Sequence, residues 1–241
     1  MRGRFAINAH LGSPPDTVLW KFLAPWKFDS LLSSRALWFS SFEVLRKADE
    51  AEGRVPPPNL VPPVDAFIEM LGPHFAHAAG VAEAVGGAFS QKVEEERRLN
   101  LVTCWFMGEE PLAHMWDRYA PDPGGVAIKS RTFKVGAAVD NNGQAQVFAF
   151  PCTYIDDDTA VTMKHFLAPF FVKRREFEDE WEMRYLVHTA EALDPGSSVE
   201  VRLQELFEHV LVNTGGDAGN LDKVREKLAA AGLNIPVEAG R

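Results

Sequence analysis

Cysteine is scarce in this chain of 241 residues, where only Cys104 and Cys152 occur, far apart and outside any CxxC pair. Two cysteines in this arrangement predict neither a disulfide framework nor a cysteine-based zinc site. The low cysteine content is typical of a reducing compartment. We therefore expect an intracellular, cytoplasmic protein.

Long apolar runs are also missing. No stretch approaches the ~20 apolar residues that a membrane span needs, and the first sixteen residues contain no apolar segment of signal-peptide length. We therefore expect no membrane association. The formal net charge of −9 repels polyanions, so nucleic-acid binding would need a local basic patch and is disfavoured.

The two glycine-rich nucleotide fingerprints, G-x-G-x-x-G and G-x-x-x-x-G-K-[ST], do not occur. Apolar runs of strand length and helical patterns alternate without the regular βαβ order of a doubly wound fold. The pattern predicts a single α+β domain over residues 1–241, with a mixed or antiparallel sheet packed with helices.

Short apolar runs bounded by turn residues predict strands of one sheet system. These runs are 19–22, 37–40, 101–106, 126–128 and 181–187. Helices are predicted at 24–34 and at the end of the chain, over 220–232. Residues 1–16 are predicted to be loose.

A proline-rich connector divides the first part of the chain. Five prolines in residues 54–63 exclude a regular helix or a central strand. The sequence after the connector has helical character, with a predicted break at Gly86 and Gly87. We interpret residues 54–98 as a helical insert.

Residues 110–120 carry an apolar stripe at helical spacing. Its members are Leu112, Met115, Trp116 and Tyr119. Such a stripe is typical of a helix that packs on a sheet. The pattern predicts that Trp116 and Tyr119 both lie in the core.

The stretch "FVKRREFEDEWEMRYLV", residues 171–187, packs nine charged residues among aromatic and aliphatic ones. As a strand, its end alternates between two faces. One face would hold Trp181, Met183, Tyr185 and Val187, and the other Glu180, Glu182, Arg184 and Leu186. The polar face is either a solvated surface with weak ion pairs or the wall of a binding site, with Lys173 and Arg174 nearby.

Five separated motifs resemble, in the same order, the bacterial family called domain of unknown function 2971. They are "LWKFLAPWKFDSLLSSRALWFS", "VTCWF", "HMWDRYAPDPGGVAIKS", "FVKRREFEDEWEMRYLV" and "LFEHVLVNTGG". The resemblance covers nearly the whole chain and retains the acidic residues Asp49 and Glu52. It implies a bacterial protein in a defence or mobile-element setting, but no established reaction.

The residue order also resembles a second pattern, that of ADP-ribosyltransferases. These enzymes place a basic residue or histidine on one strand, a serine or aromatic residue on the next, and a Glu-x-Glu pair or single glutamate on a later strand. Lys21, Ser40 and Glu182, with Glu180 two positions earlier, follow this order. The resemblance implies NAD as the substrate, with Lys21 holding the ribose or pyrophosphate and Trp38 or Phe39 stacking on nicotinamide.

The candidate site thus combines two catalytic carboxylates, Glu180 and Glu182, with a set of ligand-binding residues. The set is Lys21, Trp38, Ser40, Lys173, Arg174 and Arg184. Two other functions stay open: a non-catalytic module that binds a ligand or partner, and a nuclease-like hydrolase. In the latter, Asp49, Glu52, Glu180 and Glu182 would gather a divalent cation such as magnesium.

Overall fold

The computed structural model describes residues 16–50, 52–53, 60–61, 81–139, 147–156, 161–162 and 166–241. Most described strands belong to one sheet of nine. They are β1 (Val18–Leu23), β2 (Ala36–Ser41), β4 (Asn100–Met107), β5 (Val126–Arg131), β6 (Val147–Pro151), β10 (Glu182–His188), β11 (Gly196–Glu200), β12 (His209–Val212) and β13 (Val237–Ala239). The pairs are antiparallel except for the parallel pair β12–β13. The predicted α+β fold with a mixed sheet is confirmed.

The sheet forks at β4. Strand β10 pairs with β4 from Asn100 to Phe106 along one edge. Two strands share the other edge: β2 pairs at Leu101 and Val102, and β1 pairs at Phe106 and Met107. The order β11-β2-β4-β1-β5-β12-β13 therefore contains two branches that separate beside the middle of β4, while β10 and β6 extend the sheet on the opposite side.

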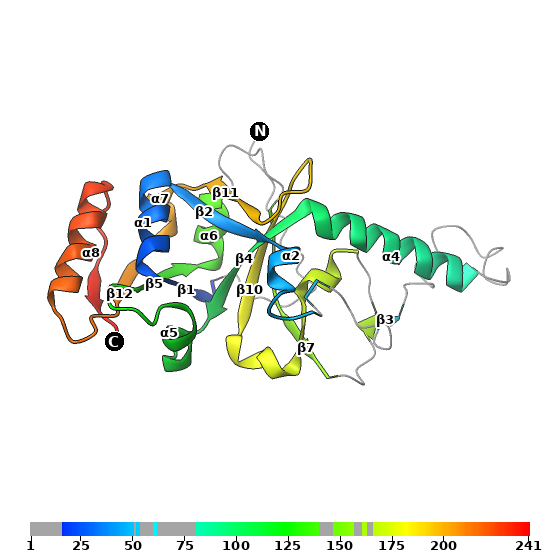
Figure 1. Cartoon of the computed structure of the whole chain (residues 1–241), viewed down its shortest axis with the longest axis horizontal. Helices are drawn as coiled ribbons and strands as arrows, with labels where there is room; N and C mark the ends of the chain where they lie inside the picture. Colours follow the sequence, from blue (N-terminus) through cyan, green and yellow to red (C-terminus); the bar gives the residue numbers. More distant parts are fainter. Residues whose placement is uncertain are drawn as a thin grey trace.

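The main core fills the space between the branches and the helices that cover them. These helices are α1 (Pro25–Ser34), α6 (Thr132–Val139), α7 (Leu203–Leu206) and α8 (Gly219–Ala230). Figure 1 shows α1 beside β2 and α8 over the end of the sheet that carries β12. The predicted helices at 24–34 and 220–232 are confirmed within a residue or two.

Two smaller apolar clusters lie on the outer faces. One lies beneath α2 (Phe42–Leu45), α4 (Val81–Leu99) and the 3-10 helix η3 (Ala168–Phe171), and contains Leu186 of β10. The other lies beneath α5 (Ala113–Tyr119) and contains Phe106 of β4. The face of β10 that carries Leu186 also carries two polar residues, Glu182 and Arg184, and these lie between the two apolar clusters.

Helix α4 corrects one detail of the predicted insert. It runs without interruption through Gly86 and Gly87, where a break was predicted. A glycine inside a helix costs only about 1 kcal/mol, and Phe89 and Val93 anchor the following turns in the outer cluster. Figure 1 shows α4 extending away from the sheet. Residues 54–59 and 62–80, which include most of the proline connector, and the predicted loose residues 1–15 lie outside the described residues.

Helix α5 confirms half of the predicted stripe. Met115 and Trp116 are buried, and the Trp116 ring packs edge-on against Phe22 with 5.3 Å between ring centroids. Leu112 and Tyr119 are 43% and 41% exposed, so the prediction that Tyr119 lies in the core is wrong. The helix spans only seven residues, and of these Met115 and Trp116 are the buried ones.

Candidate functional site

The predicted polar face of residues 180–186 is not solvated, although Arg175, Glu176, Glu178 and Asp179 before it are exposed. Glu182 lies at the start of β10, Glu180 ends the 3-10 helix η4 (Arg175–Glu180), and Lys173 lies on β9 (Val172–Arg174). Together with Arg184 of β10 and Glu52, these residues form what we call the charge cluster. All five are buried, with relative exposures of 8% or less, so the solvated interpretation is wrong.

The alternation along β10 explains how the cluster forms. From residue 182 onward the prediction is confirmed: Met183, Tyr185 and Val187 face the main core, and Leu186 faces the outer cluster. Trp181 departs from it, because this residue precedes the strand, adopts a left-handed backbone and is 58% exposed. Glu180 therefore approaches the cluster from η4 and not from the strand.

Arg184 is the centre of one half of the cluster. Its Nη2 donates to Glu52 Oε1 at 2.6 Å and to Glu182 Oε2 at 3.2 Å, and its Nη1 donates to the Phe170 carbonyl at 2.6 Å. Arg184 is fully buried. Its charge therefore holds two acidic side chains and the end of η3 together.

Lys173 is the centre of the other half. Its Nζ pairs with Glu182 Oε2 at 3.1 Å and also donates to Glu180. Glu180 in turn accepts from two residues of α5, Arg118 Nη1 at 2.8 Å and Tyr119 Oη at 3.0 Å. Because Arg118 and Tyr119 are both partly exposed, Glu180 is the cluster carboxylate that lies next to the surface.

The pairing sets the protonation states in the cluster. Burial alone would raise the pKa of Glu182, but the charges of Arg184 and Lys173 outweigh it and lower this pKa to about 2. Burial would lower the pKa of Lys173, yet Glu182 and Glu180 raise it above its ordinary value. At neutral pH, Glu182 is therefore a carboxylate and Lys173 an ammonium.

Neighbouring groups stay neutral in this environment. Burial, reinforced by the charge of Glu180, raises the pKa of Tyr119, so its phenol keeps the proton that it donates. Burial also raises the pKa of both thiols, Cys104 and Cys152. Cys152 Sγ donates to Glu182 Oε2 at 3.7 Å. Neither cysteine is a thiolate nucleophile at neutral pH, since only the deprotonated sulfur is reactive.

The other predicted ligand-binding residues lie elsewhere. Trp38 and Ser40 are on the outward side of β2, where Trp38 Nε1 donates to Ser40 Oγ at 3.2 Å. Ser40 lies two strands from β10, opposite Val102 and Leu186. Because Glu182 is four residues farther along β10, strand spacing separates it from Ser40 by about 16 Å.

Lys21 reaches the fork of the sheet, across β4 from β10. Its Nζ donates to the Cys104 carbonyl at 2.8 Å and to Thr103 Oγ1 at 2.9 Å, in the part of β4 where β1 and β2 separate. Burial lowers the pKa of Lys21 to about 8. The side chain thus satisfies a carbonyl that neither branch pairs with, which is a structural role.

Arg174 lies beside the cluster and points to a different acid. Its Nη2 pairs with the buried Asp49 at 2.9 Å, and its Nη1 pairs with Glu176 at 2.6 Å.

In the described part of the chain, no three His, Cys, Asp or Glu side chains form a group that could hold a metal ion. Asp49, Glu52, Glu180 and Glu182 each contact a cationic side chain instead.

No family model matches this chain, and no curated protein or solved structure is significantly similar to it. The two resemblances described above therefore stay predictions. None of the described helices combines the length and apolar character that crossing a bilayer requires.

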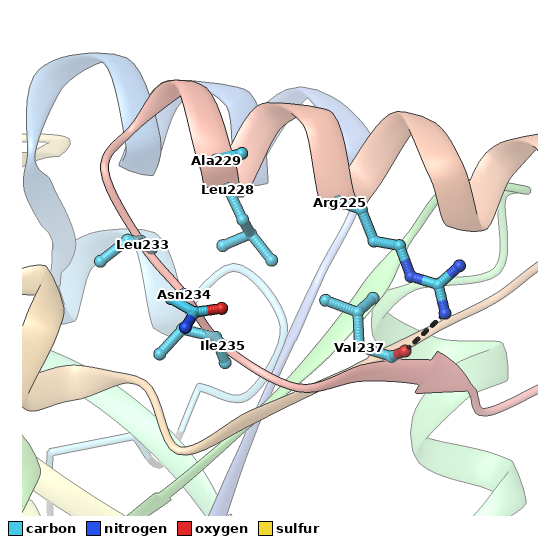
Figure 2. Close-up of a pocket in the computed structure, with 7 residues that line it drawn as sticks. All are labelled: Arg225, Leu228, Ala229, Leu233, Asn234, Ile235 and Val237. Atoms are coloured by element: carbon cyan, nitrogen blue, oxygen red, sulfur yellow. Dashed lines mark hydrogen bonds between the residues drawn. The ribbon is translucent and has the colours of Figure 1, made fainter.

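A pocket of about 250 Å³ lies at another place, between α8 and residues 233–237 (Figure 2). Its described lining is mainly aliphatic, with Arg225 at one end and Asn234 at the other. The Arg225 guanidinium donates to the Val237 carbonyl at 3.1 Å and pairs with Asp222. The described lining residues include no acid or base that could act on a substrate.

Sequence reasoning missed three residues at the surface of the charge cluster: Arg118, Tyr119 and Trp181. Tyr119 and Trp181 were assigned to the core because both matched an apolar period. Only the contact between α5 and η4 brings Arg118 and Tyr119 to Glu180. No local pattern in the sequence marks that long-range contact.

Proposed function

We propose that the segment Glu180–Trp181–Glu182 is the catalytic part of an NAD-using enzyme similar to ADP-ribosyltransferases. The observation that carries this proposal is the position of Glu180, a buried carboxylate next to the partly exposed Arg118 and Tyr119. The order Glu-x-Glu agrees with that enzyme class, although Glu180 ends η4 and only Glu182 lies on the late strand β10. A carboxylate withdrawn from water opposes a positive charge more strongly than one in solvent.

The chemistry assigns different roles to the two carboxylates. When NAD is cleaved, nicotinamide leaves with both electrons of the bond to ribose C1′, and positive charge develops on the ribose. Glu180 stabilises that charge. The acceptor's nucleophile then bonds to C1′ and gives up its proton to solvent water. Glu182, deeper in the protein, is a positioning residue because it holds Lys173, which holds Glu180.

Lys21, Trp38 and Ser40 take no part in this version of the site, because their contacts lie at the fork and on the outer side of β2. In the proposed site, the cation that contacts the pyrophosphate of NAD is Arg118 and not Lys21. The family resemblance adds the setting of such an activity, a bacterial defence or toxin protein that acts in the cytoplasm.

A nicotinamide-release assay tests this function. The purified protein is incubated with NAD, alone and with panels of protein and nucleic-acid acceptors, and its melting temperature is recorded with and without NAD. We expect nicotinamide to accumulate and the melting temperature to rise, since a ligand of the native state stabilises it. Absence of both effects would rule the proposal out.

A second function, a non-catalytic binding module, is favoured by the internal pairing of the charge cluster. Lys173 and Arg118 already pair with Glu180, the carboxylate assigned to the ribose, within the fold. A carboxylate compensated in this way contributes less to the stabilisation of a substrate cation. The same assay separates the two functions, because a binding module would gain thermal stability with NAD or another nucleotide but release no nicotinamide.

A further inference from the structure

Trp181 adopts a backbone conformation that large side chains avoid. Its φ of 36° and ψ of 58° lie in the left-handed region, which residues other than glycine, asparagine and aspartate rarely occupy. Two hydrogen bonds hold it there: its N–H donates to the Glu178 carbonyl at 3.2 Å, and its carbonyl accepts from Met107 N–H at 2.7 Å. The surrounding structure therefore fixes the backbone of Trp181 and the direction of its Cα–Cβ bond.

Packing does not explain a tryptophan at this position. The side chain is 58% exposed, and its indole makes no hydrogen bond to the described part of the chain. Glycine would adopt the same backbone without strain. Strained residues that the surrounding structure holds in place cluster at ligand sites, so the exposed ring points to a ligand.

Arg35 provides the comparison within the same protein. It is the other residue besides glycine with a positive φ in the described chain, at 52°, and it ends α1. Its guanidinium contacts the Ala231 carbonyl and Gln204 Oε1, both at 3.5 Å. The side chain of Arg35 therefore has a use within the fold, whereas the indole of Trp181 is directed to solvent.

We propose that Trp181 is the stacking surface for the planar ring of a nucleotide ligand, with Arg118 contacting its phosphates. The inference rests on the proposed function and names how that site recognises its substrate. Trp181 lies between Glu180 and Glu182, and Arg118 is bonded to Glu180 and to Asp179 at 2.8 Å and 3.3 Å. The exposed ring thus directly follows, in the chain, a carboxylate that contacts a partly exposed cation. A ring, a cation and a carboxylate are the protein groups that contact the base, the phosphates and the ribose of a nucleotide.

Calorimetric titration with nicotinamide, AMP and ADP-ribose tests the stacking role and shows which ring is bound. We expect Trp181→Ala to weaken binding of those probes whose ring stacks on Trp181 by about tenfold or more, since stacking of one base on an aromatic side chain is worth that much. Trp181→Phe should stay within about threefold of wild type because it keeps a ring. Trp26→Ala is the matched control, since Trp26 on α1 is 67% exposed and has no contact with the charge cluster.

Glycine substitutions separate a ligand role from a structural one. Trp181→Gly should have a melting temperature equal to or above that of wild type, but it should bind the probe more weakly. Arg35→Gly should leave probe binding unchanged. The proposal is overturned if wild type binds none of the three probes, if Trp181→Ala binds them as wild type does, or if Trp181→Gly lowers the melting temperature by several degrees.

The two proposals fail in different ways. If the probes bind through Trp181 but NAD is never cleaved, the proposed enzyme activity fails and the stacking surface stands. If NAD is cleaved with an unchanged KM by Trp181→Ala, the activity stands and the stacking surface fails.

Discussion

At the scale of single residues, Glu182 is the most constrained carboxylate of the charge cluster. It is 4% exposed, and its Oε2 contacts Lys173 at 3.1 Å and Arg184 at 3.2 Å. Its backbone N–H donates to Tyr154 Oη at 2.8 Å. Loss of its charge would leave Lys173 with only Glu180, and Arg184 with only Glu52, as acidic partners among these contacts.

Glu182→Gln should therefore destabilise the protein. We expect its free energy of unfolding to fall by about 3 to 5 kcal/mol, as when one partner of a buried ion pair is removed. Urea denaturation measures this change. Glu226→Gln, at an exposed position of α8, is the control and should stay within about 0.5 kcal/mol of wild type. Equal stability of both variants would mean that the cluster is solvated.

The loss of stability at acidic pH tests the same residue independently. The folded pKa of Glu182 is about 2, below its ordinary value of 4.5. Its contribution is therefore present above pH 4.5 and is lost as the pH falls from 4.5 towards 2. Over that pH window the free energy of unfolding of wild type should fall by about 3 kcal/mol more than that of Glu182→Gln. If wild type and Glu182→Gln lost equal stability over this pH window, the ionised, paired state of Glu182 would be contradicted.

The stretch 171–187 also shows what alternation can and cannot predict. Period two correctly placed Met183, Tyr185 and Val187 opposite Glu182 and Arg184, because the side chains of a strand point to alternate faces. It could not show whether the polar face meets water. That depends on Lys173, Phe170 and Glu52, which all lie outside β10.

At the scale of elements, α5 joins the apolar cluster beneath it to the surface of the charge cluster. Its middle residues, Met115 and Trp116, pack with β1 and β4 residues. Its end presents Arg118 and Tyr119 to Glu180 of η4. The buried part of α5 thus determines where its polar end lies, so packing in the apolar cluster supports the geometry of the site.

Trp116→Ala tests that support. The ring is 2% exposed, and we expect its removal to lower the free energy of unfolding by about 3 to 5 kcal/mol, as for other large-to-small core changes. Chemical denaturation gives the value. Leu112→Ala, at a 43% exposed position next to the same helix, should cost less than about 1 kcal/mol. A small effect of Trp116→Ala would mean that α5 is not anchored through this ring.

Sequence reasoning also missed whole elements. Helices α6 and α7 were not predicted: α6 has five buried positions among eight residues, and α7 has only four residues. Such segments lack the polar stripe that reveals an amphipathic helix. Tertiary packing against the main core stabilises them, and no local pattern predicts it.

At the scale of the whole molecule, the five predicted strands all belong to one sheet, but their order could not be predicted. Apolar runs identify strands, whereas pairing depends on contacts between distant segments. The fork at β4 is such a feature, and it explains why Lys21, predicted to bind a ligand, instead donates to the Cys104 carbonyl. The same long-range pairing brings η4, β9 and α5 around Glu180.

Nicotinamide release by Glu180→Gln, compared with Glu178→Gln, tests most directly whether Glu180 acts on a substrate. Glu178 lies on the same 3-10 helix but is half exposed and pairs with Arg175, so it is the matched control. Both variants are assayed with NAD at a temperature at which both are folded. We predict at least a hundredfold loss of release for Glu180→Gln, with the rise in melting temperature on adding NAD retained, and wild-type release for Glu178→Gln. Equal release by the two variants would contradict the account.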